Sequence, residues 1–291
     1  MVNALTVDVE EHFQTHAYER AIERATWDRQ ASRVVRNTRR MLGLLAEHGA
    51  HATFFVLGWV ADRHPELVRE IVAGGHELAS HGYAHELLYR LTATEFARDL
   101  GRSLEALGRA AGGGAPVLGY RAPAFSLTDD CLWALGILRE HGLRYDSSLL
   151  PVGTGEGGRA SRLRGGKRYG VTGASRFAAR VRDGLWEFPV STLRLAGRNW
   201  PVAGGGFFRL LPLWVTRRAI HRINAEGQPA IVYLHPWEID PDEPPVAGVP
   251  ALARLRHRLN VGRTEGRLRR LLGEMRFAPL REVFAGQLAH A

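Results

Sequence analysis

The stretch Leu78-Ala79-Ser80-His81-Gly82-Tyr83-Ala84-His85 joins a short, mainly apolar run to two histidines spaced four residues apart. We expect Leu78-Ala79-Ser80 to form a strand. We expect His81 and His85 to share one face of a helical turn, where one metal ion can take a ring nitrogen from each. The end of a strand is also where α/β enzymes place their chemistry. In a chain with 13 histidines such a pair also arises by chance, so its meaning depends on the rest of the sequence.

On both sides of this stretch, short apolar runs alternate with amphipathic ones. Thr92, followed by Glu95 three residues later, forms a capping box before one of the helix-like runs. This alternation predicts an α/β fold with a mainly parallel sheet, closed as a barrel or open. The predicted strands cover residues 4–9, 52–56, 78–80, 117–121, 143–146, 185–190 and 230–234, and the predicted helices cover 33–47, 65–73, 92–110, 129–141 and 212–224.

The remaining segments are expected to belong to the same domain. Residues 152–182 are rich in glycine and arginine and are predicted to form an irregular insertion rather than a linker. Residues 250–272 are predicted to form a basic helical region, and residues 277–284 to pack back on the core. We therefore expect a single catalytic domain over residues 1–285, in which residues 250–285 are a helical extension packed on the barrel.

The composition, 45% hydrophobic and 24% charged, is that of an ordinary globular protein. The formal net charge is +9, but the basic residues are arginines scattered along the chain, with Lys167 the only lysine. This distribution favours solvated helix faces over a nucleic-acid surface, and we expect no nucleic-acid partner. The single cysteine, Cys131, excludes an intrachain disulfide, and its apolar surroundings are typical of a buried helix position.

The location of the protein is also predicted from the sequence. No signal peptide precedes the first motif, and no apolar run is long enough to span a bilayer. We therefore expect a cytoplasmic protein. The basic tail from Arg254 to Arg270 is able to hold it at the inner face of an anionic membrane.

Polar side chains also follow other predicted strands. Asp8 and Glu10 end the first strand two residues apart, so both point to the same face. Arg121 ends the fourth predicted strand, and His235 follows the last one. Each has a simpler interpretation, a solvated acidic turn for the carboxylates and a hydrogen-bonded structural group for the histidine. Their recurrence at the carboxyl ends of strands favours a shared site.

Several motifs, in this order and spacing, resemble those of the polysaccharide deacetylases, carbohydrate esterase family four, with the NodB homology domain. These motifs are Thr6-Val7-Asp8-Val9-Glu10, Thr53-Phe54-Phe55-Val56-Leu57-Gly58-Trp59, Ser80-His81-Gly82-Tyr83-Ala84-His85, Arg121-Ala122-Pro123 and Leu234-His235-Pro236. Other motifs resemble the subfamily found with exopolysaccharide and exosortase (PEP-CTERM) loci. They are Tyr145-Asp146-Ser147-Ser148, Glu187-Phe188-Pro189, Gly204-Gly205-Gly206-Phe207-Phe208-Arg209 and Asn260-Val261-Gly262-Arg263-Thr264-Glu265. The resemblance runs from near residue 4 to about residue 285.

The resemblance implies a distorted (β/α)7 barrel, a divalent metal and hydrolysis of an N-acetyl group on a sugar. The implied metal is zinc, with cobalt and nickel as alternatives. Asp8 matches the catalytic base, Arg121 the arginine that holds this base, and His235 the acid that protonates the leaving amine. His81 and His85 match the metal-binding histidines.

The first motif departs from the family pattern. Most members carry adjacent aspartates, the second of which is a ligand, whereas Val9 occupies that place here and Glu10 is the nearest carboxylate. Glu10 is therefore assigned as the third ligand. Asp146 resembles the aspartate that orients the acidic histidine, and Glu187 competes for that role. Four aromatic residues are assigned to stacking on sugar rings, with core packing as their alternative use: Trp237, Phe125, Phe207 and Trp200. Tyr83 is also assigned to substrate binding.

Three functions from different classes follow. The favoured one is a metal-dependent N-deacetylase in exopolysaccharide or related glycan biosynthesis, acting on an N-acetylated sugar or oligosaccharide that is lipid-linked or nucleotide-linked. A metal-independent amidohydrolase on a small amide substrate would instead keep full activity after chelation. A catalytically silent glycan-binding or scaffold protein would bind an oligosaccharide and release no acetate.

Overall fold

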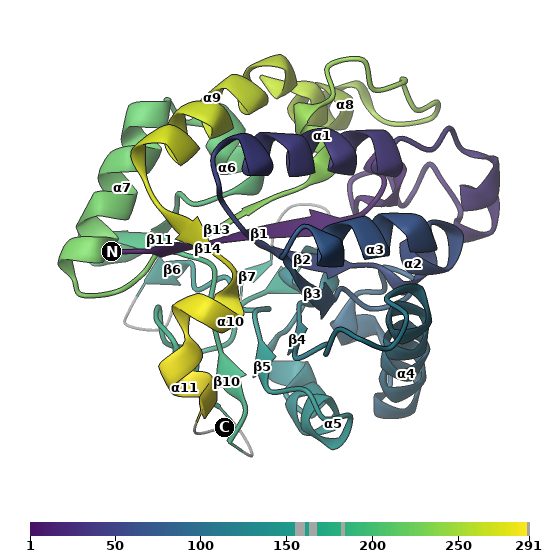
Figure 1. Ribbon diagram of the computed structural model, residues 1–291, viewed down its shortest axis with the longest axis horizontal. Helices are drawn as coiled ribbons and strands as arrows, with labels where there is room; N and C mark the ends of the chain where they lie inside the picture. Colours follow the sequence, from purple (N-terminus) through teal and green to yellow (C-terminus); the bar gives the residue numbers. More distant parts are fainter. Residues whose placement is uncertain (155–160, 163–167, 182–183, 290–291) are drawn as a thin grey trace.

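Seven short parallel strands form the centre of the molecule (Figure 1). The computed structural model describes residues 1–154, 161–162, 168–181 and 184–289. Its largest sheet has the order β13-β1-β2-β3-β4-β5-β10-β9, and β14 also pairs with β1. The parallel strands are β1 (Asn3–Val9), β2 (Thr53–Val56), β3 (Glu77–Ser80), β4 (Gly119–Tyr120), β5 (Tyr145–Asp146), β10 (Trp186–Glu187) and β13 (Ile231–Leu234).

The strands follow each other in chain order and the last returns beside the first, as a (β/α) barrel requires. Within the described residues no ladder joins β10 to β13. Between these two strands, the backbone N–H of Ser191 donates to the carbonyl of Ile231 at 3.2 Å. The predicted distorted seven-stranded barrel is therefore confirmed, in the form of a curled and incompletely closed sheet.

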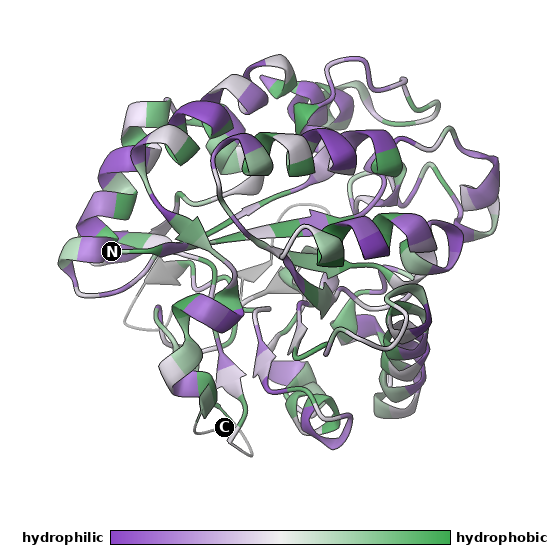
Figure 2. Cartoon of the chain, viewed as in Figure 1, coloured by the Kyte–Doolittle hydropathy of each residue, from purple (hydrophilic) through white to green (hydrophobic). Residues whose placement is uncertain are grey.

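Helices lie over the outer side of this sheet. Because β1, β2 and β3 are buried along their whole length, the sheet must be covered on both faces. The helices bury one face and expose the other, and they carry both hydrophobic and hydrophilic residues in Figure 2. They are α1 (Val34–Glu47), α2 (Gly58–Arg63), α3 (Pro65–Ala73), α4 (Ala93–Ala110), α5 (Ala134–Glu140), α6 (Gly205–Leu210), α7 (Leu213–Ala225), α8 (Ala251–Arg258) and α9 (Val261–Glu274).

The C-terminal segment closes the amino end of the barrel. β14 (Phe277–Ala278) pairs with the start of β1, and α10 (Leu280–Val283) and α11 (Ala285–Ala289) follow it. Leu280 and Phe284 belong to one apolar cluster with Phe55 and Phe188 of the barrel strands and their ends. The rings of Phe188 and Phe284 stack with their centres 4.2 Å apart. The prediction that residues 277–284 pack back on the core is thus confirmed.

The predicted irregular insertion is partly regular. Residues 155–160, 163–167 and 182–183 of this segment lie outside the described residues. In the described part, β9 (Ala179–Arg180) pairs antiparallel with β10, so this end of the segment extends the main sheet. β6 (Gly153–Thr154) pairs with β12 (Arg198–Pro201), which also pairs with β11 (Thr192–Leu195), and β7 (Ser161–Arg162) pairs with β8 (Arg168–Tyr169). The prediction of an irregular segment is wrong for these residues.

Two other predictions have clear outcomes. The predicted helix over 129–141 is divided into a short 3₁₀ helix, Asp129–Cys131, and α5. Cys131 is buried, as expected. In the described part of the chain, no helix has both the length and the apolar character needed to cross a bilayer.

The N-terminus of α4 is stabilised by the predicted capping box. The Thr92 hydroxyl accepts a hydrogen bond from the Glu95 N–H (3.3 Å), and the Glu95 carboxylate accepts one from the Thr92 N–H (2.8 Å). We expect Thr92→Ala to lower the free energy of unfolding by about 1 kcal/mol, because a helix N–H loses its acceptor. Urea denaturation measures this. Thr94→Ala is the matched control, since Thr94 is also exposed in the same first turn, and an equal loss there would contradict the capping role.

Candidate active site

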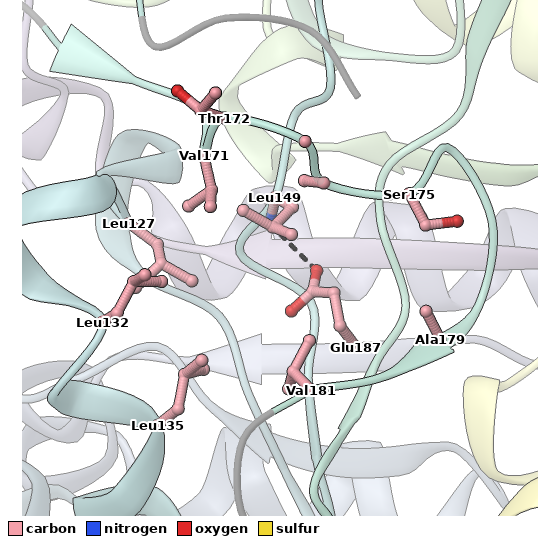
Figure 3. A pocket seen from close by; sticks show the side chains of 12 residues that line it. Leu127, Leu132, Leu135, Leu149, Val171, Thr172, Ser175, Ala179, Val181 and Glu187 are labelled. Atoms are coloured by element: carbon pink, nitrogen blue, oxygen red, sulfur yellow. Dashed lines mark hydrogen bonds between the residues drawn. The ribbon is translucent and has the colours of Figure 1, made fainter. Parts of the chain in front are cut away.

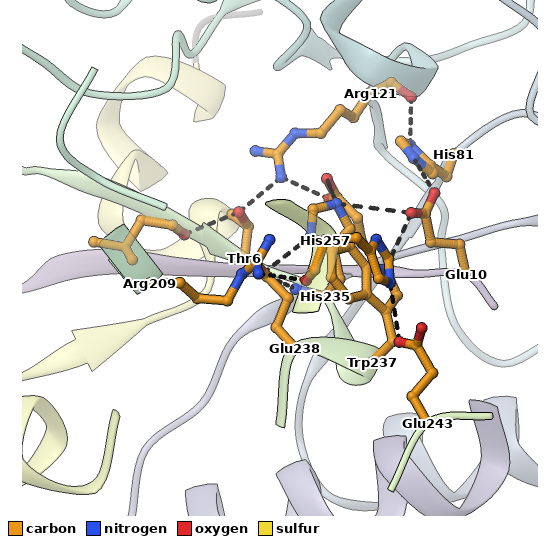
Figure 4. A network of polar contacts seen from close by, with 12 residues as sticks. Thr6, Glu10, His81, Arg121, Arg209, His235, Trp237, Glu238, Glu243 and His257 are labelled. Carbon is orange, nitrogen blue, oxygen red and sulfur yellow. Dashed lines mark hydrogen bonds and ion pairs between the residues drawn. The ribbon is translucent and has the colours of Figure 1, made fainter. Parts of the chain in front are cut away.

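Residues at the ends of four strands meet at the carboxyl edge of the sheet, and most of them are seen in Figure 4. Asp8 lies in β1 and Glu10 directly after it, while His81 follows β3, Arg121 follows β4 and His235 follows β13. Asp8, Glu10, His81 and Arg121 are almost fully buried. The His235 side chain is the most accessible of the five, at 17%. Access to the site is therefore on the side of His235.

Arg121 fixes Asp8. Its Nη1 donates hydrogen bonds to Asp8 Oδ1 and to Thr6 Oγ1, both at 2.7 Å, and its Nε and Nη2 donate to the carbonyl and hydroxyl of Ser147. The arginine is fully buried, so each charge of the pair compensates the other. The second carboxylate oxygen of Asp8, Oδ2, lies 3.9 Å from Nε2 of His235. Asp8 is thus held by one oxygen and presents the other to the site.

Glu10, His81 and His85 form a group of potential metal ligands. One ligand atom from each lies within 4.8 Å of the others, and all three residues are buried. Glu10 Oε2 is 2.7 Å from His85 Nε2 and 3.8 Å from His81 Nε2, yet it receives no hydrogen bond of suitable geometry. Burial alone would raise the pKa of Glu10, but the nearby histidines, His85 first, lower it well below its usual range.

The tautomer of His81 suits a ligand. Its Nδ1 lies 2.8 Å from the backbone carbonyl of Arg121, which can only accept a hydrogen bond. The proton of the neutral ring is therefore on Nδ1, and the lone pair of Nε2 points toward Glu10. A buried carboxylate oxygen without a donor, facing imidazole nitrogens, is a donor set that fits a divalent cation such as zinc.

A loop, and not the predicted helical turn, brings the two histidines together. Residues 81–86 contain no helix, and Gly82 and His85 have left-handed φ angles of 74° and 51°. Asp99 of α4 holds this loop by accepting a hydrogen bond from the Tyr83 N–H at 2.8 Å. A Cβ at position 82 would lie 3.0 Å from the Asp99 carboxylate, so glycine allows this close approach. The pairing predicted for the histidines is confirmed, but its helical geometry is wrong.

The partner of His235 is Glu238, which the sequence analysis missed. His235 Nδ1 lies 3.0 Å from Glu238 Oε2, and Arg209 Nε donates to the other oxygen of Glu238 at 2.7 Å. Burial would lower the pKa of His235, but the hydrogen bond and charge of Glu238, with the charges of Glu10 and Asp8, raise it to about 9. Glu238 three residues after a histidine at a helix start is a capping-box spacing, and this signal was available in the sequence.

Asp146 and Glu187 therefore do not orient His235, and both assignments are corrected. Asp146 accepts a hydrogen bond from the Ser148 hydroxyl and contacts Glu187, whose Oε1 accepts one from the Leu149 N–H at 3.0 Å. Glu187 lines an apolar cavity of about 250 Å³ (Figure 3). Burial raises the pKa of Asp146 to about 6, and burial with the nearby Asp146 raises that of Glu187 above its usual range. Burial and their proximity therefore favour the protonated form of these two carboxyl groups in the barrel wall.

Trp237 lies inside the site. Its indole stacks on His235 on one side and on His257 on the other, with ring centres 5.0 and 4.1 Å apart. Its Nε1–H donates to Glu10 Oε1 at 3.3 Å, and its exposed fraction is only 6%. Trp237 thus orients a potential ligand and a potential acid, which is a different use from the predicted stacking on a sugar.

The other aromatic residues assigned to the substrate differ in position, and Trp200 lies exposed on β12. The Tyr83 hydroxyl donates to Asp62 at 2.9 Å and accepts from Arg102 at 2.7 Å, so this buried side chain is held by α2 and α4, and its assignment to substrate is wrong. Phe125 is buried against Tyr233, with ring centres 4.8 Å apart. The side chain of Phe207, on α6, is 39% exposed and can therefore contact a ligand.

Comparison with known proteins shows that parts of the chain are similar to deacetylases. Residues 23–145 match the family profile described as polysaccharide deacetylase, and residues 162–285 match a domain of unknown function, DUF3473. A chitooligosaccharide deacetylase of Sinorhizobium fredii is 39% identical over 95 residues, which are 33% of this chain and 44% of that protein. A peptidoglycan-N-acetylglucosamine deacetylase of Bacillus cereus is 35% identical over 75 residues, 26% of this chain and 27% of that protein. The chain thus spans less than half the length of these relatives.

The fold has a solved counterpart. A structure from Mycobacterium smegmatis, provisionally named polysaccharide deacetylase, aligns with a TM-score of 0.64 and 23% identity, over 99% of this chain and 90% of that chain. Neither family profile contains all the residues of the site described above. His81, His85 and Arg121 lie within the first profile, His235 lies within the second, and Asp8 and Glu10 precede both.

Proposed function

We propose that this chain is a metal-dependent hydrolase of the polysaccharide deacetylase family that removes N-acetyl groups from an amino sugar, because residues 23–145 match the profile of that family. One observation carries the proposal. The cluster of Glu10, His81 and His85 lies beside two groups that can transfer protons. These groups are Asp8, which an arginine holds, and His235, which a carboxylate holds. Amide hydrolysis needs these groups together, because it needs both a proton acceptor and a proton donor.

In this proposal Glu10, His81 and His85 hold the metal ion, and zinc suits two imidazoles and one carboxylate. When bound, such an ion polarises the carbonyl of the acetamide and activates water. The remaining work belongs to the chain. Trp237 fixes Glu10 by its indole N–H, and the Arg121 carbonyl fixes His81 by its Nδ1–H, so the ligand orientations are set before metal binds.

Asp8 and His235 move the protons. Asp8 is held by Arg121 through Oδ1 and accepts a proton from the attacking water through Oδ2, because that oxygen faces the site. His235 donates a proton to the sugar nitrogen as the C–N bond breaks, because the hydrogen bond and the charge of Glu238 raise its pKa and so favour the protonated ring. The products are acetate and a free amine. An amine leaves poorly as an anion, so a protonated histidine is needed at this point.

The biological setting is a further part of the proposal. We place the substrate among the N-acetylated sugars of exopolysaccharide assembly because of the motif resemblances at residues 145–148, 204–209 and 260–265. We place the reaction on the cytoplasmic side of the membrane. Fractionation of cells that make the native protein tests this location, and recovery mainly in the periplasm or medium would contradict it.

Acetate release tests the activity. Purified protein should release acetate from chitooligosaccharides or from lipid-linked or nucleotide-linked N-acetyl sugars, lose this activity after chelation, and regain it with zinc. Full activity after chelation would indicate the metal-independent amidohydrolase instead. Oligosaccharide binding without acetate release, even with added zinc, would indicate a silent glycan-binding protein.

Trp237→Phe tests the hydrogen bond from the Trp237 indole N–H to Glu10. Phenylalanine keeps an aromatic ring between His235 and His257 but cannot donate a hydrogen bond to Glu10. Loss of such an outer contact is expected to lower metal affinity by about 10- to 100-fold, measured by titration of zinc into metal-free protein. Trp200→Phe is the matched control, because Trp200 is 51% exposed on β12. Equal zinc affinities in the two variants would contradict the role of the indole N–H.

A further inference from the structure

Exposed apolar side chains are concentrated on three helices, α6, α7 and α8. Nine large hydrophobic residues are exposed in the described part of the chain, and six of them lie on or next to α6, α7 and α8. We call these six residues the α6–α8 surface: Phe207, Leu210, Trp214, Leu252, Leu255 and Leu259, with exposed fractions between 39% and 65%. A concentration of this kind marks an interaction site more often than scattered single residues do.

Two of the helices that carry this surface, α6 and α8, are joined by hydrogen bonds. Leu252, Leu255 and Leu259 are spaced three and four residues apart and so form one stripe along α8. Arg209, beside Leu210 on α6, donates from Nη1 to the carbonyl of Leu259 at 3.1 Å. The end of α6 and the end of α8 therefore lie against each other, and their exposed leucines flank the same hydrogen bonds.

The segments that carry this surface are basic, although Arg209 and Arg217 are paired with Glu238 and Glu274. Residues 202–225 and 244–264 contain eight arginines and no aspartate or glutamate. Arg254, Arg256 and Arg258 are exposed between the leucines of α8. Leucines that enter the acyl boundary, beside arginines that reach the head groups, are the pattern of a helix lying on an anionic bilayer. The exposed Trp214 fits the same interface.

The surface also lies next to the candidate active site. His257 of α8 stacks on Trp237, which stacks on His235, with ring centres 4.1 and 5.0 Å apart. Arg209 of α6 bonds both the end of α8 and Glu238, the partner of His235. His235 is also the most accessible of the strand-end groups. A substrate anchored in a bilayer at this surface would thus carry its sugar beside the accessible histidine.

We propose that the α6–α8 surface docks on an anionic lipid bilayer, and that the substrate is an amino sugar linked to a lipid in that bilayer. The evidence for docking is the exposed leucines and arginines alone. The identity of the substrate rests in addition on the proposed deacetylase function.

Vesicle binding tests the docking. Wild-type protein should co-sediment with vesicles of phosphatidylglycerol and phosphatidylcholine, and far less with phosphatidylcholine alone. Arg254→Gln/Arg256→Gln should weaken binding roughly 25-fold, since each arginine contributes about fivefold near an anionic surface. Leu252→Gln/Leu255→Gln should weaken it as well, at unchanged net charge. Arg69→Gln/Arg109→Gln, which removes the same charge from exposed positions on α3 and α4, should bind like wild type.

Other results would overturn the docking. One is binding to soluble dextran sulfate but to no vesicle. Others are an equal loss of vesicle binding in the α3–α4 control and unchanged vesicle binding in the leucine variant. The last is loss of a dimer in the leucine variant with no change in vesicle binding. Acetate release separates the two parts of the inference. The α8 variants should keep activity on a soluble chitooligosaccharide and lose it on a lipid-linked N-acetyl sugar in anionic vesicles. Vesicle binding without acetate from any substrate would defeat the deacetylase function and leave the docking intact.

Discussion

Asp8→Asn is expected to lower the rate of acetate release by a factor on the order of 10²–10⁴ while metal binding is retained. Asparagine keeps the shape of the side chain, and its carbonyl oxygen can still accept the hydrogen bond from Arg121 Nη1, which spans 2.7 Å in the wild type. It cannot accept a proton from water. The loss should therefore appear in turnover and not in metal content, and steady-state rates with elemental analysis measure both.

This substitution also leaves the buried Arg121 without its counter-charge, so folding has to be followed by thermal unfolding. Asp240→Asn is the matched control. Asp240 is likewise a buried aspartate in an ion pair, 2.9 Å from Arg33, but it lies outside the candidate site. A similar fall in turnover in both variants would mean that loss of a buried ion pair, and not loss of a base, explains the effect.

Glu10→Ala is expected to remove metal and activity together. It deletes one of the three proposed ligands, so the loss of zinc affinity should exceed the loss of about 10- to 100-fold expected when a contact to a ligand is removed. His81→Ala and His85→Ala should behave in the same way. Glu11→Ala is the control, because this neighbouring buried glutamate bonds the Arg33 N–H at 2.9 Å and is not part of the cluster. Zinc lost equally from Glu11→Ala would indicate a general effect of unfolding.

The strand ends were predictable from the sequence because a strand repeats every two residues. This period places Thr6, Asp8 and Glu10 on one face, and Arg121 indeed bonds the first two. The order of the elements also fixed which strand ends meet, since parallel strands connected through helices present their carboxyl ends to one edge. Local pattern and topology were sufficient for these residues.

The loop geometry was not predictable in the same way. The conformation of residues 81–85 depends on Asp99, which lies on α4 and bonds the Tyr83 N–H. Tyr83 itself is turned away by Asp62 and Arg102, on two different helices. Contacts between residues so far apart in the sequence leave no periodic signal, so spacing alone wrongly indicated a helical turn and a substrate contact.

The assignment of Asp146 failed for a different reason. The resemblance pointed to a carboxylate from another strand, whereas a carboxylate three residues after His235 is already within reach in a short helical turn. Glu238 takes that place and is itself held by Arg209. The local capping geometry was therefore the better guide to the partner of His235.

The central claim is that Glu10 holds the metal and Asp8 acts as the base. Elemental analysis of purified Glu10→Ala and Asp8→Asn, side by side with wild type, tests it most directly. The expected result is zinc at the wild-type level in Asp8→Asn and little or none in Glu10→Ala. Zinc retained in Glu10→Ala and lost in Asp8→Asn would contradict the assignment and make Asp8 the ligand.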